Sequence, residues 1–187
     1  MIFVREGCIG ERMFYLKKIL ALFFAFFSTS VIADEYGDTR FSAKVFCGTC
    51  DIAIYVDGVI ARDIYMGSVT LGGTSAKKTF VVKAADPSKP ECRIFATSGK
   101  YTNARITLSG DFNRKGLGNF AGTASDAWVR ITPINALKNN DVTFNNSAIL
   151  FPIDKLISDG FQFDAFLNGV KNAGTYRSKV GLTVVYL

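Results

Sequence analysis

Three cysteines carry the most distinctive reactive chemistry in the chain downstream of its N-terminal segment. Cys47 and Cys50 form a C-x-x-C pair, and Cys92 follows further along the chain. Such a pair can be a redox centre, but the flanking residues lack the strand-then-helix context that this chemistry needs. We therefore interpret the cysteines as structural. In an exported chain they predict at least one disulfide, with one thiol left over, and Cys47 can be free or paired.

General acid–base and metal chemistry have little support. The sequence contains no histidine, the residue that most often serves as general base and metal ligand. A hydrolase would need a cluster of acids, and Asp154, Asp159 and Asp164 stand apart in the sequence. The stretch around Gly116 and Gly118 lacks the third glycine of a dinucleotide-binding loop. We expect no catalytic residue, no metal, no cofactor and no enzymatic activity.

Aromatic and charged residues indicate two kinds of binding to consider. Trp128, Tyr101, Tyr65 and Phe112 could stack on a sugar, although we expect Trp128 to pack in the core. The net charge is +6, with no long run of one sign. Scattered charges of this kind are typical of a solvated surface, so nucleic acid is not an expected partner.

The N-terminal segment has the pattern of a secretion signal. Two lysines precede the apolar run 19–27, and small or aliphatic residues lead to Ala33. The run is too short to cross a bilayer, which disfavours a membrane anchor. We predict a signal peptide over residues 1–33, with Ser30 as the alternative cleavage residue and Met13 as a candidate true start. Export through this signal would lead to the periplasm and beyond.

Strands and turns are expected to position these residues, because period-2 alternation recurs along the chain. Asp57 and Gly58 give a turn signal, and residues 154–158 could form one helical turn. No stretch sustains a longer helical period. About seven or more short strands favour one all-β sandwich domain. The expected strands are Phe41–Val45, Ile52–Val56, Ser68–Leu71, Thr79–Lys83, Arg105–Ser109, Ala127–Thr132, Ala148–Ile153, Phe161–Leu167 and the C-terminal stretch from Val180.

The C-terminal strand is the most informative element. Val180, Leu182, Val184 and Tyr186 alternate with smaller or polar residues up to the chain end. This spacing predicts one buried face. Chain ends usually fray, so we expect another structure to hold this strand in place.

A set of residues in fixed order resembles the pilin subunits of chaperone–usher fimbriae of the type 1-like kind. The most specific match is a glycine fourteenth from the C-terminus, Gly174, together with the penultimate Tyr186. The stretch 102–113 looks most like the fimbrial subunits of enterotoxigenic calf strains. The other matching residues are Phe41-Ser-Ala-Lys-Val45, Thr49-Cys50, Leu71-Gly72, Phe80-Val-Val-Lys83 and Cys92.

The resemblance implies an incomplete immunoglobulin-like β-sandwich, a pilin fold that is completed by a donor strand from another chain. It implies a Cys50–Cys92 disulfide and a domain over residues 47–187. Residues 34–46 would form the N-terminal extension and donor strand leading into the first strand. The donor segment is identified by Phe41, Ala43 and Val45. The groove that binds the chaperone and the donor strand is identified by Gly174, Val180, Leu182, Val184 and Tyr186.

The function implied by the resemblance is that of a structural subunit of an adhesive fimbria at the cell surface. Its expected partners are a periplasmic pilus chaperone, an outer-membrane usher and neighbouring pilins, with host glycans as a further candidate. Cleavage after Ala33 would leave a short extension, which suits a minor subunit, although a stalk role is also open. The alternative is a stand-alone secreted lectin, which would be a complete sandwich that needs no added strand.

Overall fold

The computed structural model describes residues 39–42, 50–169 and 173–187. The expected signal peptide lies outside the described residues, as do Ala43, Val45 and Cys47. The strands are β1 Thr39–Ser42, β2 Ile52–Val56, β3 Val59–Ile60, β4 Asp63–Ile64, β5 Lys78–Ala84, β6 Asn103–Gly110, β7 Leu117–Gly118, β8 Trp128–Pro133, β9 Ala148–Pro152, β10 Phe161–Asn168 and β11 Lys179–Tyr186; the helices are α1 Pro90–Thr97 and the 3-10 helix η1 Ile153–Leu156.

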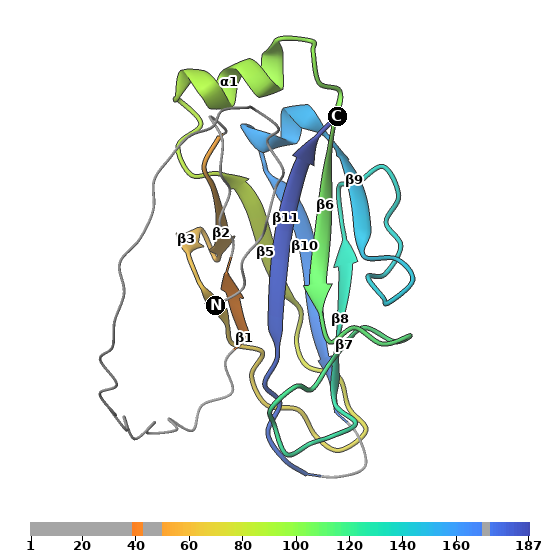
Figure 1. Cartoon of the computed structure of the whole chain (residues 1–187). Coiled ribbons are helices and arrows are strands. Elements are labelled where there is room, and N and C mark those ends of the chain that lie inside the picture. The colour runs from red at the N-terminus through yellow and green to blue at the C-terminus, as the bar shows by residue number, and fades with distance from the viewer. Residues whose placement is uncertain (1–38, 43–49, 170–172) are drawn as a thin grey trace, which may run out of the picture.

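Two sheets pack face to face, which confirms the predicted β-sandwich (Figure 1). One sheet has the strand order β4-β1-β11-β6-β9, and the other has the order β3-β2-β5-β10-β8-β7. Every ladder between described strands is antiparallel except one, because β1 runs parallel to β11. Apart from the pairs β2–β3 and β7–β8, neighbours in each sheet are not consecutive in sequence, as expected for a sandwich in which the chain crosses between layers.

Alternating side chains fill the space between the sheets. The eight residues of β10 alternate strictly between buried and half-buried. Its Phe163 stacks on Phe80 of β5, with ring centroids 5.0 Å apart, and meets Phe151 of β9 at 5.3 Å. Aromatic contacts across the layers therefore join both sheets into one core.

Some sequence-based boundaries are wrong. Residues 68–71 were expected to form a strand, but they lie outside any ladder, and Leu71 begins a turn. A helix was not expected, yet α1 spans eight residues, with Pro90 in its first turn. Proline is well tolerated there because the first turn has no N–H partner to lose. Only Cys92 of this helix is buried, so no apolar stripe marked it in the sequence.

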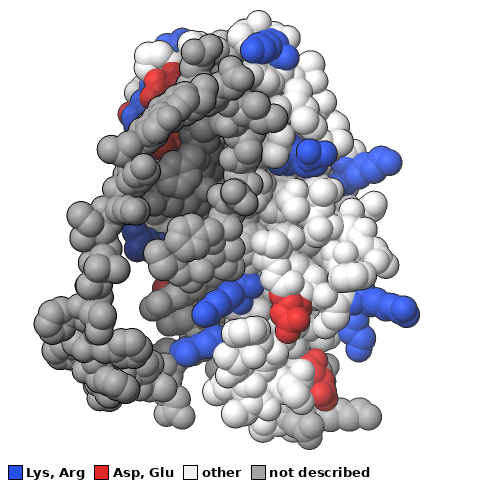
Figure 2. All heavy atoms as spheres, viewed as in Figure 1, with Lys and Arg blue, Asp and Glu red and all other residues white. Residues whose placement is uncertain are grey.

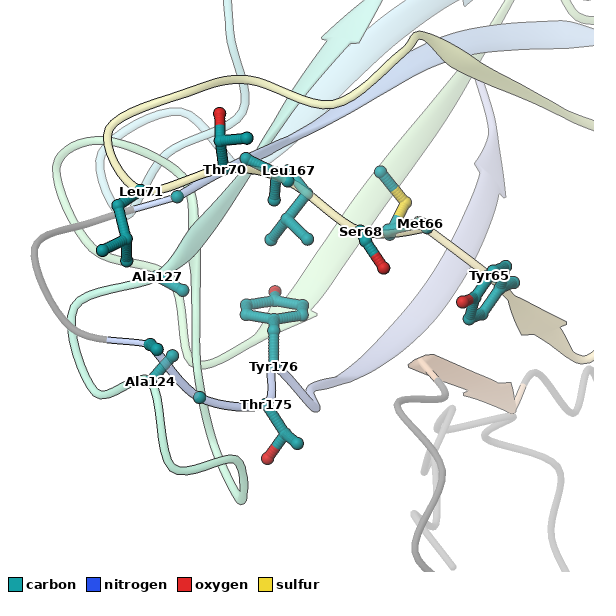
Figure 3. Close-up of a pocket in the computed structure, with 15 residues that line it drawn as sticks. Tyr65, Met66, Ser68, Thr70, Leu71, Ala124, Ala127, Leu167, Thr175 and Tyr176 are labelled. Carbon is teal, nitrogen blue, oxygen red and sulfur yellow. The ribbon is translucent and has the colours of Figure 1, made fainter.

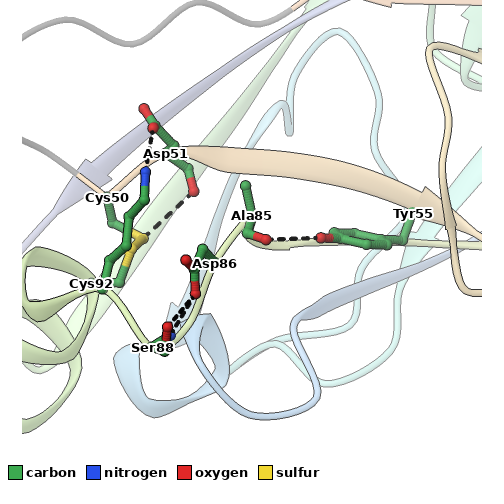
Figure 4. Close-up of a disulfide and its surroundings, with 8 residues drawn as sticks. Cys50, Asp51, Tyr55, Ala85, Asp86, Ser88 and Cys92 are labelled. Atoms are coloured by element: carbon green, nitrogen blue, oxygen red, sulfur yellow. Dashed lines mark hydrogen bonds and ion pairs between the residues drawn. A yellow bond between two sulfur atoms is a disulfide. The ribbon is translucent and has the colours of Figure 1, made fainter.

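The disulfide ties α1 to the start of β2 (Figure 4). Cys50 and Cys92 are both fully buried, and the bridge joins residues separated by 42 positions. Beside it, Lys89 Nζ lies 3.4 Å from Asp51 Oδ2. The pairing that the resemblance implied is therefore present. Since Cys50 is bonded to Cys92, it is not available to form a C-x-x-C disulfide with Cys47.

The two ends of the sandwich differ. Helix α1 lies at the end where β11 finishes, and long loops gather at the end where β11 begins (Figure 1). Phe95 of α1 stacks on Tyr186 of β11, with ring centroids 4.5 Å apart. No helix among the described residues is long and apolar enough to cross a membrane.

Candidate functional site

The last strand, β11, has one buried face and two edges along which other strands can pair. Val180, Leu182 and Val184 are 1%, 2% and 5% exposed and point between the sheets. Tyr186 is half-buried in the aromatic cluster with Phe95 and Tyr101. The four residues singled out from the sequence thus share the core side of one strand.

One edge of β11 is fully paired and the other only in part. Antiparallel β6 pairs with β11 from Val180 to Tyr186. On the opposite edge, β1 pairs with Lys179, Val180 and Gly181. Among the described residues, no strand pairs with that edge across residues 182–185. An edge of this kind offers main-chain hydrogen bonds to an added strand.

A cavity of about 540 Å³ continues the line of this edge beyond the start of β11 (Figure 3). One wall is formed by residues 65–71, which follow β4, and the other includes residues 173–176, which precede β11. Because β1 lies between β4 and β11 in the sheet, the cavity lies past the N-terminal end of β1, whereas the unpaired residues 182–185 lie past its C-terminal end. Met66 and Leu167 supply apolar surface to it.

The core beside this cavity contains a second, small apolar hollow. Met66 lines both this hollow and the larger cavity. Its other walls come from both sheets: Ile64, Phe80, Leu117, Val129, Ile131 and Ala165. The hollow is no larger than about one water molecule, so the core behind the edge is nearly close-packed.

Tyr176 forms part of the cavity wall and is 9% exposed. Its hydroxyl donates a hydrogen bond to the carbonyl oxygen of Leu117 at 3.1 Å. Burial raises the pKa of the Tyr176 phenol above its ordinary value, so the hydroxyl keeps its proton and remains a donor. The wall is thereby fixed to β7 on the other sheet.

Gly174 lies where the segment before β11 crosses a neighbouring loop. A Cβ atom at this position would lie 2.6 Å from Ala124 N and 2.6 Å from Thr123 Oγ1. The two segments are joined by hydrogen bonds, including Ala124 N to Thr175 O at 3.0 Å and Thr175 N to Thr123 Oγ1 at 2.9 Å. The close backbone approach explains why glycine occupies this position.

We expect Gly174→Ala to lower the free energy of unfolding by about 1–3 kcal/mol, because the added methyl group must push two backbones apart. The measurement is urea unfolding followed by fluorescence of Trp128, the one tryptophan in the chain. Ala173→Ser, at the exposed neighbouring residue, serves as the control and should leave the unfolding midpoint unchanged. Equal stability of both variants would show that the segments separate without cost.

The predicted donor segment is only partly described. Phe41 lies in β1, where its register partner is Val180 of the same chain. Ala43 and Val45 lie outside the described residues. The sequence did not indicate that this segment pairs with its own C-terminal strand.

Two of the three carboxylates considered for catalysis, those of Asp159 and Asp164, have structural partners. Thr79 Oγ1 donates to Asp164 Oδ1 at 2.6 Å, and Lys77 Nζ lies 3.4 Å from Asp164 Oδ2. The Ser158 hydroxyl donates to Asp159 and lowers the pKa of that carboxyl. In the described part of the chain, no three histidine, cysteine or acidic residues form a group able to hold a metal.

The aromatic residues considered for sugar stacking do not share one site. Tyr101 packs beside Tyr186 near α1, whereas Tyr65 lines the cavity at the opposite end. The expectation that Trp128 packs in the core is wrong. Val129 and Ile131 take the inward positions of β8, which leaves Trp128 half-buried on the outer face. On the face seen in Figure 2, lysine and arginine side chains stand in separate small groups.

No protein-family model matches the chain. It is 28% identical over 176 residues to the F107 fimbrial protein of Escherichia coli, an alignment that covers 91% of this chain and 99% of that protein. This distant homology supports a fimbrial structural subunit. It also supports the expectation that the chain is not an enzyme, because fimbrial subunits are structural proteins.

Proposed function

We propose that this protein is a subunit of an adhesive fimbria that is assembled by donor-strand exchange and contributes to cell adhesion. One observation carries the proposal. The edge of β11 across residues 182–185 has no paired strand among the described residues, although the side chains of Leu182 and Val184 form part of the core. The distant likeness to a fimbrial protein agrees with it.

An extended strand from another chain fits this site in two ways. Its backbone would hydrogen-bond along the edge of β11, in the manner of strand addition. Its alternate side chains would point inward, beside the buried side chains of Leu182 and Val184, and a strand that continued past the start of β11 would reach the cavity of about 540 Å³. Backbone pairing would supply affinity, and the fit of the inward side chains would supply specificity.

Two kinds of partner would use the same edge in turn. A periplasmic chaperone would cover it first, and the N-terminal extension of a neighbouring subunit would replace the chaperone at an outer-membrane usher. The resulting location is the fimbria on the cell surface. Because the added strand binds only the folded subunit, it should raise the stability of the subunit by mass action.

The finer assignments rest on the sequence. A short extension before Phe41 favours a minor subunit over a stalk subunit, because a short donor strand makes fewer main-chain hydrogen bonds. The particular resemblance to calf-strain subunits stays a prediction, as does an interaction with host glycans. The described aromatic residues do not come together in one sugar-binding site, so they give no support to the lectin alternative.

The proposal is tested with a synthetic peptide of residues 34–46, added to the purified complex of the protein with a fimbrial chaperone. We expect the peptide to displace the chaperone and to raise the melting temperature of the released subunit. A peptide with the same residues in scrambled order is the control, because it lacks the alternation of apolar and polar side chains that the site would recognise. Equal effects of both peptides would contradict a strand-specific site.

A further inference from the structure

Strand β1 occupies a place in the sheet that another chain would need. It pairs on one side with β11, where Arg40, Phe41 and Ser42 are the register partners of Lys179, Val180 and Gly181. On the other side it pairs with β4, through Thr39 with Ile64 and Arg40 with Asp63. The chain therefore adds its own strand to the edge of β11.

We propose that residues 39–42 form an intramolecular cap on the strand-binding edge of β11. This inference rests on the proposed function, and it adds a form of self-regulation to it. A strand that pairs antiparallel along the whole of β11 would need the positions beside residues 179–181, which β1 occupies. The cap must leave before such a strand can bind in full.

While residues 39–42 cap β11, they are also unavailable to serve as a donor strand for another subunit. Phe41 belongs to the expected donor segment, and in the capped chain it lies beside Val180 of its own sheet. A capped subunit can thus neither accept a full strand nor donate its own. Premature polymerisation would be suppressed in both directions by one contact.

The cap runs parallel to β11 because of the way in which it is joined to the rest of the chain. Cys50 is bonded to Cys92 in α1, and Phe95 of α1 stacks on Tyr186 at the end of β11. Cys50 is therefore tied to the end of the sandwich at which β11 finishes, whereas Arg40 pairs with Lys179 at the start of β11. An intramolecular strand at this position is held parallel, whereas a strand from a second chain is free to bind antiparallel.

The cap is short enough to be displaced. It has three register pairs with β11 and two with β4, and Phe41 is the one apolar residue of its four. A longer strand would form more main-chain hydrogen bonds and could insert several apolar side chains. Covalent linkage gives the short cap a high effective concentration, which favours it until a longer strand arrives.

A reversible cross-link tests the cap. Arg40 and Lys179 are register partners in the parallel ladder, and neighbouring strands bring partner Cα atoms within the range that a disulfide can span. We would express the full chain with Arg40→Cys and Lys179→Cys in a Cys47→Ser background. The out-of-register control carries Arg40→Cys with Thr183→Cys. Mass spectrometry should find an intramolecular disulfide in the first variant and much less in the control.

The cross-linked monomer is then offered the peptide of residues 34–46, before and after mild reduction. We expect at least ten-fold slower peptide uptake in the cross-linked state and recovery on reduction. A variant that lacks residues 34–42 should take up the peptide at least ten-fold faster than the parent chain.

The outcomes separate the two proposals. Failure to form the in-register cross-link, or equal uptake in the cross-linked and reduced states, would overturn the cap. If the reduced chain and the shortened chain both fail to bind the peptide, the proposed strand-binding function is wrong. Slow uptake that recovers on reduction supports both.

Discussion

Removal of the disulfide, in the variant Cys50→Ala/Cys92→Ala, is expected to lower the free energy of unfolding by about 4 kcal/mol. The two cysteines are separated by 42 positions, and cross-linking a loop of this length removes much of the freedom of the unfolded chain. A loss of about 4 kcal/mol is a large share of the stability of an ordinary domain. The measurement is urea unfolding of the parent and the variant, followed by Trp128 fluorescence.

The matched control for this variant is Cys47→Ala. Cys50 is bonded to Cys92 and not to Cys47, so the control should unfold at the same urea concentration as the parent. A double variant within about 1 kcal/mol of the parent would mean that contacts around α1 hold the region without the bridge. A control as unstable as the double variant would indicate that Cys47 pairs in place of one of the other two.

Truncation of the central core residue of β11, in Leu182→Ala, is expected to cost about 2–5 kcal/mol. Leu182 is 2% exposed and is the register partner of Leu108 on β6. Removing its side chain loses buried apolar contacts and leaves a cavity between the sheets. The same change removes part of the surface under the proposed strand-binding edge.

Thr183→Ala is the control for this second prediction, since Thr183 is half-buried on the opposite face of the same strand. We expect it to change the free energy of unfolding by less than about 1 kcal/mol. Peptide binding by both variants is measured with the peptide of residues 34–46. Weaker binding by Leu182→Ala alone would agree with a strand that inserts above the core face, and equal binding by both would contradict it.

The long strands were predictable because their burial alternates. The sequence indicated Phe161–Leu167 and the structure has Phe161–Asn168, while Thr79–Lys83 corresponds to Lys78–Ala84. Each strand has one face in the core, so period 2 is visible in the residue types. The two-residue strands β3 and β4 have no such period. Strand β3 is defined by pairing with β2 across the turn at Asp57 and Gly58, and β4 by pairing with β1.

The helix and the face of Trp128 were missed for local reasons. Helix α1 buries Cys92 alone, is joined to β2 by the disulfide and stacks Phe95 on Tyr186, so two contacts with distant parts of the chain hold it and no apolar stripe marks it in the sequence. Trp128 begins a strand in which Val129 and Ile131 are buried. Size and apolar character favoured the core for Trp128, but strand alternation decides which face a residue takes.

The site was predictable where it depends on one strand and not where it depends on several segments. The spacing of Val180, Leu182 and Val184 indicated a buried face, and the structure buries all three. The cavity at the start of β11 combines residues 65–71 with residues 173–176, and no local pattern connects segments so far apart. The pairing of β1 with its own last strand is likewise a tertiary contact.

Native mass spectrometry of the protein purified from the periplasm, with a fimbrial chaperone co-expressed, tests the central claim most directly. Our account predicts a one-to-one complex with the chaperone, a ladder of subunits after the chaperone is released, and low stability of the uncomplemented subunit. A stable monomer that does not bind the chaperone and forms no series of multimers would contradict it. The sandwich would then be complete without a partner strand.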